Sequence, residues 1–171
     1  MYLEHVYSKG LAHSSYVAGS GNTCVVVDPT RNISRYLEIA SSSGMSIAAV
    51  LETHLHADFI SGHIDLHERT GAPIYAPKSA ACEFLHQPVS DGSRFTLDDC
   101  EISVIETPGH TPEHVSYIVT HLSSGNEPVA LFSGDTLFVG DVGRPDLFPG
   151  RARELAGALY DSLHEKIMKL P

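Results

Sequence analysis

A seven-residue stretch, Glu52-Thr-His-Leu-His-Ala-Asp58, constrains this chain more than any other feature. It places two imidazoles and a carboxylate within five residues, directly after the apolar run 47–51. In an extended backbone the side-chain period of two puts His54, His56 and Asp58 on one side. In a helix, His54 and His56 would instead point about 200° apart. Three side chains that can bind metal therefore leave the end of a buried strand together.

Two further clusters of the same kind follow along the chain. They are Thr107-Pro-Gly-His-Thr-Pro112 and Ser133-Gly-Asp-Thr136, and each comes directly after an apolar, strand-like run. The glycine before each polar residue favours a close approach of the backbone to a site. Imidazoles and carboxylates together suit Fe, Zn, Mn or Co. The sequence therefore predicts a metal site with His54, His110 and Asp135 as ligands.

The order of these clusters resembles that of a known family. His-x-His-x-Asp, a later Gly-His and a later Gly-Asp form the ligand order of the metallo-β-lactamase superfamily. The segments 54–63 (HLHADFISGH) and 140–146 (GDVGRPD) are similar to its persulfide dioxygenase branch, in particular to bacterial enzymes that often carry attached rhodanese domains. The resemblance implies one α/β domain over residues 1–171, an αββα sandwich with the metal site at one edge of its two sheets.

The same resemblance implies that the C-terminal layer of the sandwich is truncated. Members of the family continue past the last helix into a further strand and a histidine-containing turn, whereas this chain stops at Leu170-Pro171. We therefore expect the domain to lack an edge layer, which another chain could supply.

The number of metals follows from a comparison with the dinuclear zinc hydrolases of the superfamily, such as glyoxalase II. In those enzymes the residue at the position of His56 binds the first metal. The residue at the position of Asp58 and an adjacent histidine bind the second metal. Here the adjacent residue is Phe59, which cannot bind metal, and the chain ends before the final histidine of the second site. Two histidines and one carboxylate with open positions are typical of non-haem Fe(II) oxygenases. We expect one Fe(II) per chain, with zinc as the alternative.

Three residues are expected to serve the reaction without binding metal. The resemblance places His56 and Asp58 beside the ligands, where such partners fix the orientation of an imidazole. Arg144 lies in the turn Gly143-Arg-Pro-Asp146. Its guanidinium could bind a substrate carboxylate through two hydrogen bonds, or the segment could be a tight turn capped by Asp146.

The remaining candidates have simpler interpretations. His63 and His67 are spaced as neighbours on a helix and are interpreted as packed side chains. His114 begins a strand, and a role in lining a pocket is left open. Asp28 either caps a turn or accepts a hydrogen bond near the site. His13 belongs to no cluster.

These residues lead to three hypotheses about function. The first is a persulfide dioxygenase that converts a low-molecular-weight thiol persulfide and dioxygen to sulfite and thiol. The second is a zinc-dependent thioester hydrolase of the glyoxalase II type, and the third is an inactive metal-binding fragment. The thiol carrier, a homo-oligomeric state and a rhodanese partner are left open.

The composition limits the binding partners and the cellular location that we expect. A net charge of -10 argues against nucleic acid and anionic membranes. No apolar run reaches the ~20 residues that span a bilayer, and the N-terminus lacks the pattern of a signal peptide. Three cysteines without close spacing do not form a disulfide framework. We therefore expect a cytoplasmic protein.

Periodicity and turn residues predict the secondary structure. Helices are expected over 34–42, 58–69 and 151–169, the second with Ile60 and Ile64 on its packed stripe. Strands are expected over 2–7, 13–18, 23–28, 46–52, 73–76, 101–107, 115–120 and 129–132.

Overall fold

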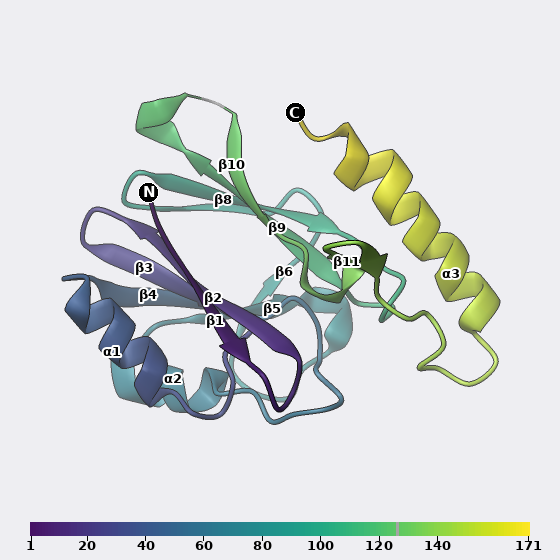
Figure 1. Ribbon diagram of the computed structural model, residues 1–171, viewed down its shortest axis with the longest axis horizontal. Coiled ribbons are helices and arrows are strands. Elements are labelled where there is room, and N and C mark those ends of the chain that lie inside the picture. The colour runs from purple at the N-terminus through teal and green to yellow at the C-terminus, as the bar shows by residue number, and fades with distance from the viewer. Residues whose placement is uncertain (126) are drawn as a thin grey trace.

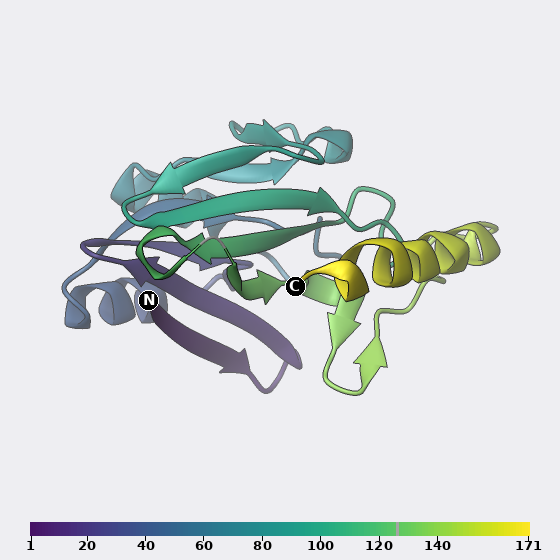
Figure 2. The same ribbon diagram turned by 90° about the horizontal axis from the view of Figure 1, so that it is seen from above.

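Two β-sheets lie face to face in the computed structural model, which describes residues 1–125 and 127–171 (Figures 1 and 2). The first sheet has the strand order β1-β2-β3-β4-β5-β6. Its first three strands pair antiparallel, and β3 to β6 pair parallel. The bounds are β1 Tyr2–Ser8, β2 His13–Ser20, β3 Thr23–Val27, β4 Ser46–Leu51, β5 Ile74–Pro77 and β6 Gln87–Val89.

The second sheet is antiparallel, with the order β10-β9-β8-β7. A small hairpin follows β10 and projects beyond the sheet (Figure 2). The bounds are β7 Arg94–Leu97, β8 Cys100–Glu106, β9 Val115–His121, β10 Pro128–Phe132, β11 Leu137–Phe138 and β12 Asp141–Val142.

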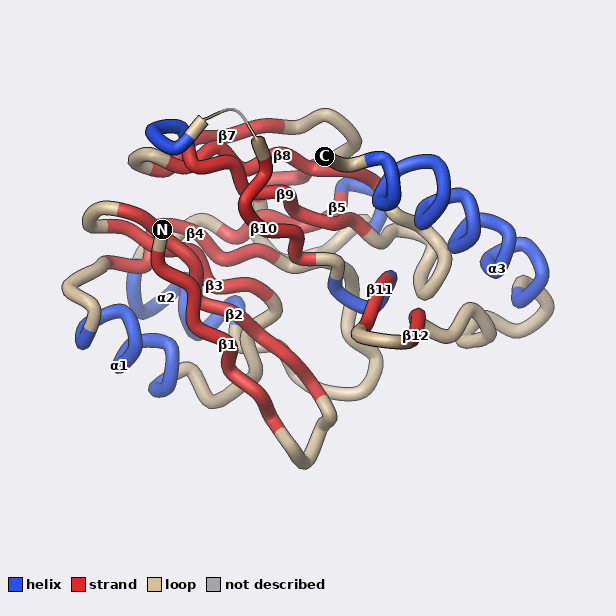
Figure 3. The backbone as a smooth tube through the Cα atoms, turned by 45° about the horizontal axis from the view of Figure 1, so that its top comes forward, coloured by secondary structure: helices blue, strands red, loops and turns tan. Residues whose placement is uncertain are grey.

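Period-two alternation places the core between the sheets and a second apolar layer behind the first sheet. Val25 and Val27 of β3 face Ile102 and Val104 of β8 in the inner cluster. The alternate residue Val26 faces the helices α1 (Ser34–Ser42) and α2 (His63–Thr70) in the outer cluster. These two helices cover the outer face of the first sheet (Figures 1 and 3). β3 is buried on both faces, which explains its continuous run of apolar residues.

The last helix, α3 (Ala152–Asp161), lies on the opposite side of the molecule from α1 and α2 (Figure 1). It continues as a π turn over Ser162–Lys166 and a 3-10 turn over Ile167–Lys169. The Ser162 hydroxyl donates to the Pro108 carbonyl at 2.8 Å, which fixes α3 on the loop after β8. Shorter 3-10 turns span Lys78–Ala80, Leu122–Ser124 and Gly134–Thr136. Within the described part of the chain, no helix is long and apolar enough to cross a membrane.

The eight predicted strands and the first predicted helix are confirmed, with ends displaced by at most two residues. The start of the third predicted helix is confirmed, but α3 ends at Asp161, and the rest of the predicted range forms the π and 3-10 turns. Strands β6, β7, β11 and β12, which are two to four residues long, were not predicted. The predicted start of the second helix is wrong: α2 begins at His63, and 58–62 is a loop. Its packed stripe is also wrong, since Ile60 and Ile64 are 65% and 44% exposed. Leu66 is the buried residue of α2.

Candidate metal centre

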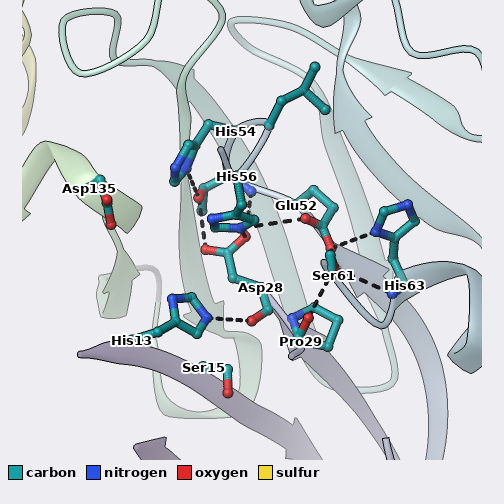
Figure 4. A network of polar contacts seen from close by, with 12 residues as sticks. His13, Ser15, Asp28, Pro29, Glu52, His54, His56, Ser61, His63 and Asp135 are labelled. Atoms are coloured by element: carbon teal, nitrogen blue, oxygen red, sulfur yellow. Dashed lines mark hydrogen bonds and ion pairs between the residues drawn. The ribbon is translucent and has the colours of Figure 1, made fainter. Parts of the chain in front are cut away.

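The candidate site lies where the parallel strands β3 and β4 end. Carboxyl ends of neighbouring parallel strands meet at one edge of a sheet, the usual place for a site in α/β folds. Asp28 follows β3, and Thr53 and His54 follow β4. Asp28, His54 and His56 lie close together in Figure 4. The buried Asp28 carboxylate accepts the Thr53 backbone N–H at 2.8 Å and the Thr53 hydroxyl at 2.7 Å. These bonds hold the segment that carries His54.

The structure brings the three predicted ligands together. His54, His110 and Asp135 each offer a ligand atom, and these atoms all lie within 4.8 Å of one another. His110 comes from the loop between β8 and β9, and Asp135 from the turn after β10. The His110 Nε2 atom lies 3.4 Å from Asp135 Oδ2. Three separate segments of the chain therefore converge on one point.

The hydrogen bonds of the two imidazoles fit a metal ion. The single hydroxyl hydrogen of Thr53 goes to Asp28, so Thr53 Oγ1 accepts from His54 Nδ1 at 2.9 Å. His110 Nδ1 lies 3.1 Å from the Arg144 carbonyl, which can only accept. Both imidazoles thus carry their proton on Nδ1 and present the lone pair of Nε2. Burial, reinforced by nearby imidazoles, lowers the pKa of His54 well below its usual value, which keeps this ring neutral as a ligand must be.

Asp135 is placed by a turn that only glycine permits and by a buried histidine. Gly134 has φ +47°, and a Cβ atom there would lie 2.4 Å from Thr53 Oγ1. His114 Nε2 accepts the Asp135 backbone N–H at 3.1 Å, while its Nδ1 lies 3.1 Å from the Thr136 hydroxyl. Burial lowers the pKa of His114 to about 3, so the ring stays neutral and accepts this bond. His114 therefore orients Asp135 and lies outside the three-ligand group.

His56 faces two carboxylates behind the ligands. Its Nε2 atom lies 3.2 Å from Asp28 Oδ1 and 3.5 Å from Glu52 Oε2, with all three side chains nearly inaccessible. Burial alone would lower the pKa of His56, but the two carboxylates outweigh it and raise the pKa to about 9. The Phe59 ring packs on His56 at a centroid distance of 4.4 Å. The Nε2 atom of His56 groups with the carboxylates of Asp28 and Glu52 and not with the three ligand atoms, although its ring lies 4.2 Å from the ring of His54.

Two clefts reach the ligands from different sides. One of about 420 Å³ is lined by His54, His110, Asp135 and Arg144, and another of about 510 Å³ extends toward the β1–β2 hairpin. The exposed Asp58 lines both. The Arg144 guanidinium donates to Asp146 through Nε at 2.6 Å and Nη2 at 3.0 Å. Arg144 therefore borders the cleft and is paired with Asp146, and its role toward a substrate stays a prediction.

Sequence reasoning gave too little weight to several residues. His13 Nε2 donates to the Asp28 carbonyl at 2.8 Å, and its ring packs on Phe59 at 4.4 Å. Glu52 is buried beside His56. His114 was left open, and the signal that could have identified it is its position seven residues after Thr107, to whose hydroxyl its Nδ1 bonds across the β8–β9 turn. The interpretation of His67 as a structural residue agrees with its bond to the Ala72 carbonyl.

Known proteins resemble this chain in sequence and in structure. Residues 8–170 match the Metallo-beta-lactamase superfamily. The hydroxyacylglutathione hydrolase of Synechococcus sp. (strain WH7803) is 37% identical over 148 residues, which cover 84% of this chain and 57% of that protein. A second hydroxyacylglutathione hydrolase, from Methylobacillus flagellatus, is 36% identical over 86% of this chain and 53% of its own length. The chain thus spans about half the length of the curated relatives it matches.

Two solved structures superimpose over the whole chain. A metallo-beta-lactamase from Staphylococcus aureus subsp. aureus COL has a TM-score of 0.92 and 35% identity, with 53% of that protein covered. ETHE1 from Myxococcus xanthus has a TM-score of 0.87 and 28% identity, with 72% covered. The two-sheet architecture expected from the sequence is therefore the fold of these proteins.

Proposed function

The chain belongs to the metallo-beta-lactamase superfamily, and on that premise we propose that it is a metal-dependent enzyme which oxidises a low-molecular-weight thiol persulfide. The reaction is RSSH + O2 + H2O giving RSH and sulfurous acid, which ionises to sulfite. The S–S bond breaks, the terminal sulfur is oxidised, and dioxygen takes up the four electrons. We also propose that residues 1–171 form one domain. The chain spans only part of the length of its relatives. The activity of the whole protein is therefore a proposal.

The observation that carries the proposal is the composition of the centre. Two imidazoles with free Nε2 atoms and one carboxylate converge, while His56 faces Asp28 and Glu52. Phe59 occupies the position beside Asp58 where a dinuclear enzyme would have a histidine. A bound Fe(II) would have open coordination positions in this set and would supply the oxygen chemistry of non-haem iron enzymes. The ligand set supports one metal better than two.

In this proposal, residues of the cleft orient the thiol carrier. We propose that a carboxylate of the thiol carrier takes the place of Asp146 on the Arg144 guanidinium, because both groups bind arginine through two oxygens. Leu55, Phe138 and Leu147 add apolar side chains to the lining of the same cleft. Replacing Arg144 by Gln should then raise KM with a smaller change in kcat, which is the effect of losing uniform binding.

The decisive experiment combines metal analysis with oxygen uptake. Protein purified without chelator is loaded with Fe(II) in the absence of oxygen and then mixed with glutathione persulfide and air-saturated buffer. We expect one iron per chain, oxygen consumption and sulfite formation. No uptake by folded, iron-loaded protein would refute the proposal.

A second candidate is favoured by the curated relatives, whose name is hydroxyacylglutathione hydrolase. By name, these relatives support hydrolysis of a glutathione thioester more directly than oxidation. One metal can serve such a hydrolysis as a Lewis acid, so Phe59 does not exclude it. Two zinc ions per chain with thioester hydrolysis and no oxygen uptake would establish this candidate. Bound metal with neither activity would leave the inactive metal-binding fragment.

The partners follow from the proposed reaction. We propose that the substrates are a thiol persulfide and dioxygen, and that a rhodanese could deliver the persulfide sulfur. Size-exclusion chromatography tests a homo-oligomer, and cell fractionation tests the proposed cytoplasmic location. Activity with glutathione persulfide compared with coenzyme A persulfide would identify the carrier.

A further inference from the structure

Glu52 is a buried carboxylate that the three ligands do not use. It follows β4 directly and is 2% exposed. Its backbone is fixed on both sides, because its N–H donates to the Tyr75 carbonyl at 2.9 Å and its carbonyl accepts the Tyr117 hydroxyl at 2.9 Å. A carboxylate withdrawn from water is costly unless hydrogen bonds and opposite charge compensate it. The partners of Glu52 therefore indicate what it does.

These partners lie at both ends of the loop 53–62. At the far end, the Ser61 hydroxyl lies 2.7 Å from Glu52 Oε1, and His63 Nδ1 lies 3.4 Å from the same oxygen (Figure 4). Near the start, His56 Nε2 lies 3.5 Å from Glu52 Oε2. The Ser61 hydroxyl also lies 3.0 Å from the Pro29 carbonyl, but the shorter contact and the charge of the carboxylate favour Glu52.

The loop 53–62 carries aromatic side chains that pack closely at the metal centre. His54 lies near its start, and the centroid of the His56 ring lies 4.2 Å from that of His54 and 4.4 Å from that of Phe59. No regular backbone ladder holds 53–62 apart from the isolated bridge between Thr30 and Ser61. Backbone hydrogen bonds hold its two ends, from the Gly62 N–H to the Pro29 carbonyl at 2.9 Å and from the Val115 N–H to the Thr53 carbonyl at 2.8 Å. Between these ends side-chain contacts help to define its path, and the Glu52 side chain contacts both His56 and the start of α2.

We infer that Glu52 is a positioning residue of the metal centre, whose carboxylate ties the start of α2 to His56 and so fixes the loop that carries His54. The inference rests on the proposed metal centre, but not on the choice between oxidation and hydrolysis. Glu52 touches no ligand of the three, so its effect passes through the loop. A carboxamide in its place would keep an oxygen for Ser61 but lose the charge that faces His56 and His63.

The test uses Co(II) as the metal probe and hydrogen exchange as a readout that needs no metal. Variants Glu52→Gln and Ser61→Ala are compared with Glu101→Gln, a control on the far sheet whose carboxylate pairs with Arg94. In metal-free Glu52→Gln, amides of 53–62 should exchange at least about tenfold faster, as expected for a loop that loses its anchoring contacts. Co(II) should bind on the order of 10–100-fold more weakly, as when a partner behind a ligand is lost. The visible spectrum at saturation should also shift.

Ser61→Ala should change hydrogen exchange and Co(II) binding in the same direction as Glu52→Gln, but by less. If Glu52→Gln folds poorly, Ser61→Ala still tests the inference. Glu101→Gln should match the wild type. Faster exchange with an unchanged Co(II) spectrum and affinity would overturn the inference, because Glu52 would then only stabilise the loop. Unchanged exchange in both variants would overturn it as well. A wild-type protein that takes up no Co(II) would instead refute the metal centre and the proposed function with it.

Discussion

Replacing Gly134 by Ala tests how the centre is built. Gly134 has φ +47°, and an added Cβ would lie 2.4 Å from Thr53 Oγ1 and 2.7 Å from His114 Nε2. Both neighbours are fully buried. Thr53 orients His54, and His114 orients Asp135, so the added methyl group would displace the groups that set two of the three ligands.

The expected loss of stability has two parts. A residue with a Cβ in the left-handed conformation costs about 1–2 kcal/mol, and overpacking a buried site costs about 1–3 kcal/mol more. Gly140 supplies the matched control, since it has φ +81° and no atom within 4 Å of an added Cβ. Gly140→Ala should show only the first cost. Gly134→Ala should therefore be less stable than Gly140→Ala by about 1–3 kcal/mol.

Urea unfolding of the metal-free variants measures this difference, and Co(II) titration measures its effect on the site. We expect Gly134→Ala to lose most of its metal affinity and Gly140→Ala to keep it. Equal destabilisation of the two variants would refute the steric argument. Wild-type affinity in Gly134→Ala would show that this turn does not place a ligand.

Three further predictions concern single side chains. His110→Ala should remove one of three ligands and abolish stoichiometric metal, which elemental analysis checks; retained metal would exclude His110 as a ligand. Phe59→His should add at most weak second-site zinc, and a wild-type protein that already holds two metals would contradict the argument from Phe59. The metal-free protein should become less stable as the pH rises from about 6.5 through about 9, because Asp28 and Glu52 outweigh burial and raise the pKa of His56 to about 9. Below the unfolded value of 6.5 this stabilisation is fully present, and an equally steep loss in His56→Ala would assign it to another group.

Local sequence patterns predicted the strands and the ligands because both depend on short-range geometry. Apolar runs identified β3, β4, β8, β9 and β10, and the polar residues directly after them identified His54, His110 and Asp135. A strand end is a fixed place in a layered fold, so polar residues at several strand ends meet at one edge. The shortest strands lacked enough residues to show a period.

The sequence by itself determined which side chains could hold a metal and that Phe59 is not one of them. Only the tertiary structure decided where the residues around these ligands lie. Spacing put His56 beside His54, and their rings do lie 4.2 Å apart, but contacts with Asp28 and Glu52 aim the Nε2 atom of His56 at these two carboxylates. Spacing likewise began α2 at Asp58, whereas 58–62 forms an irregular loop in which Ser61 contacts Pro29 and Glu52. These outcomes depend on charges and hydrogen bonds between residues up to 32 positions apart, which no local period records.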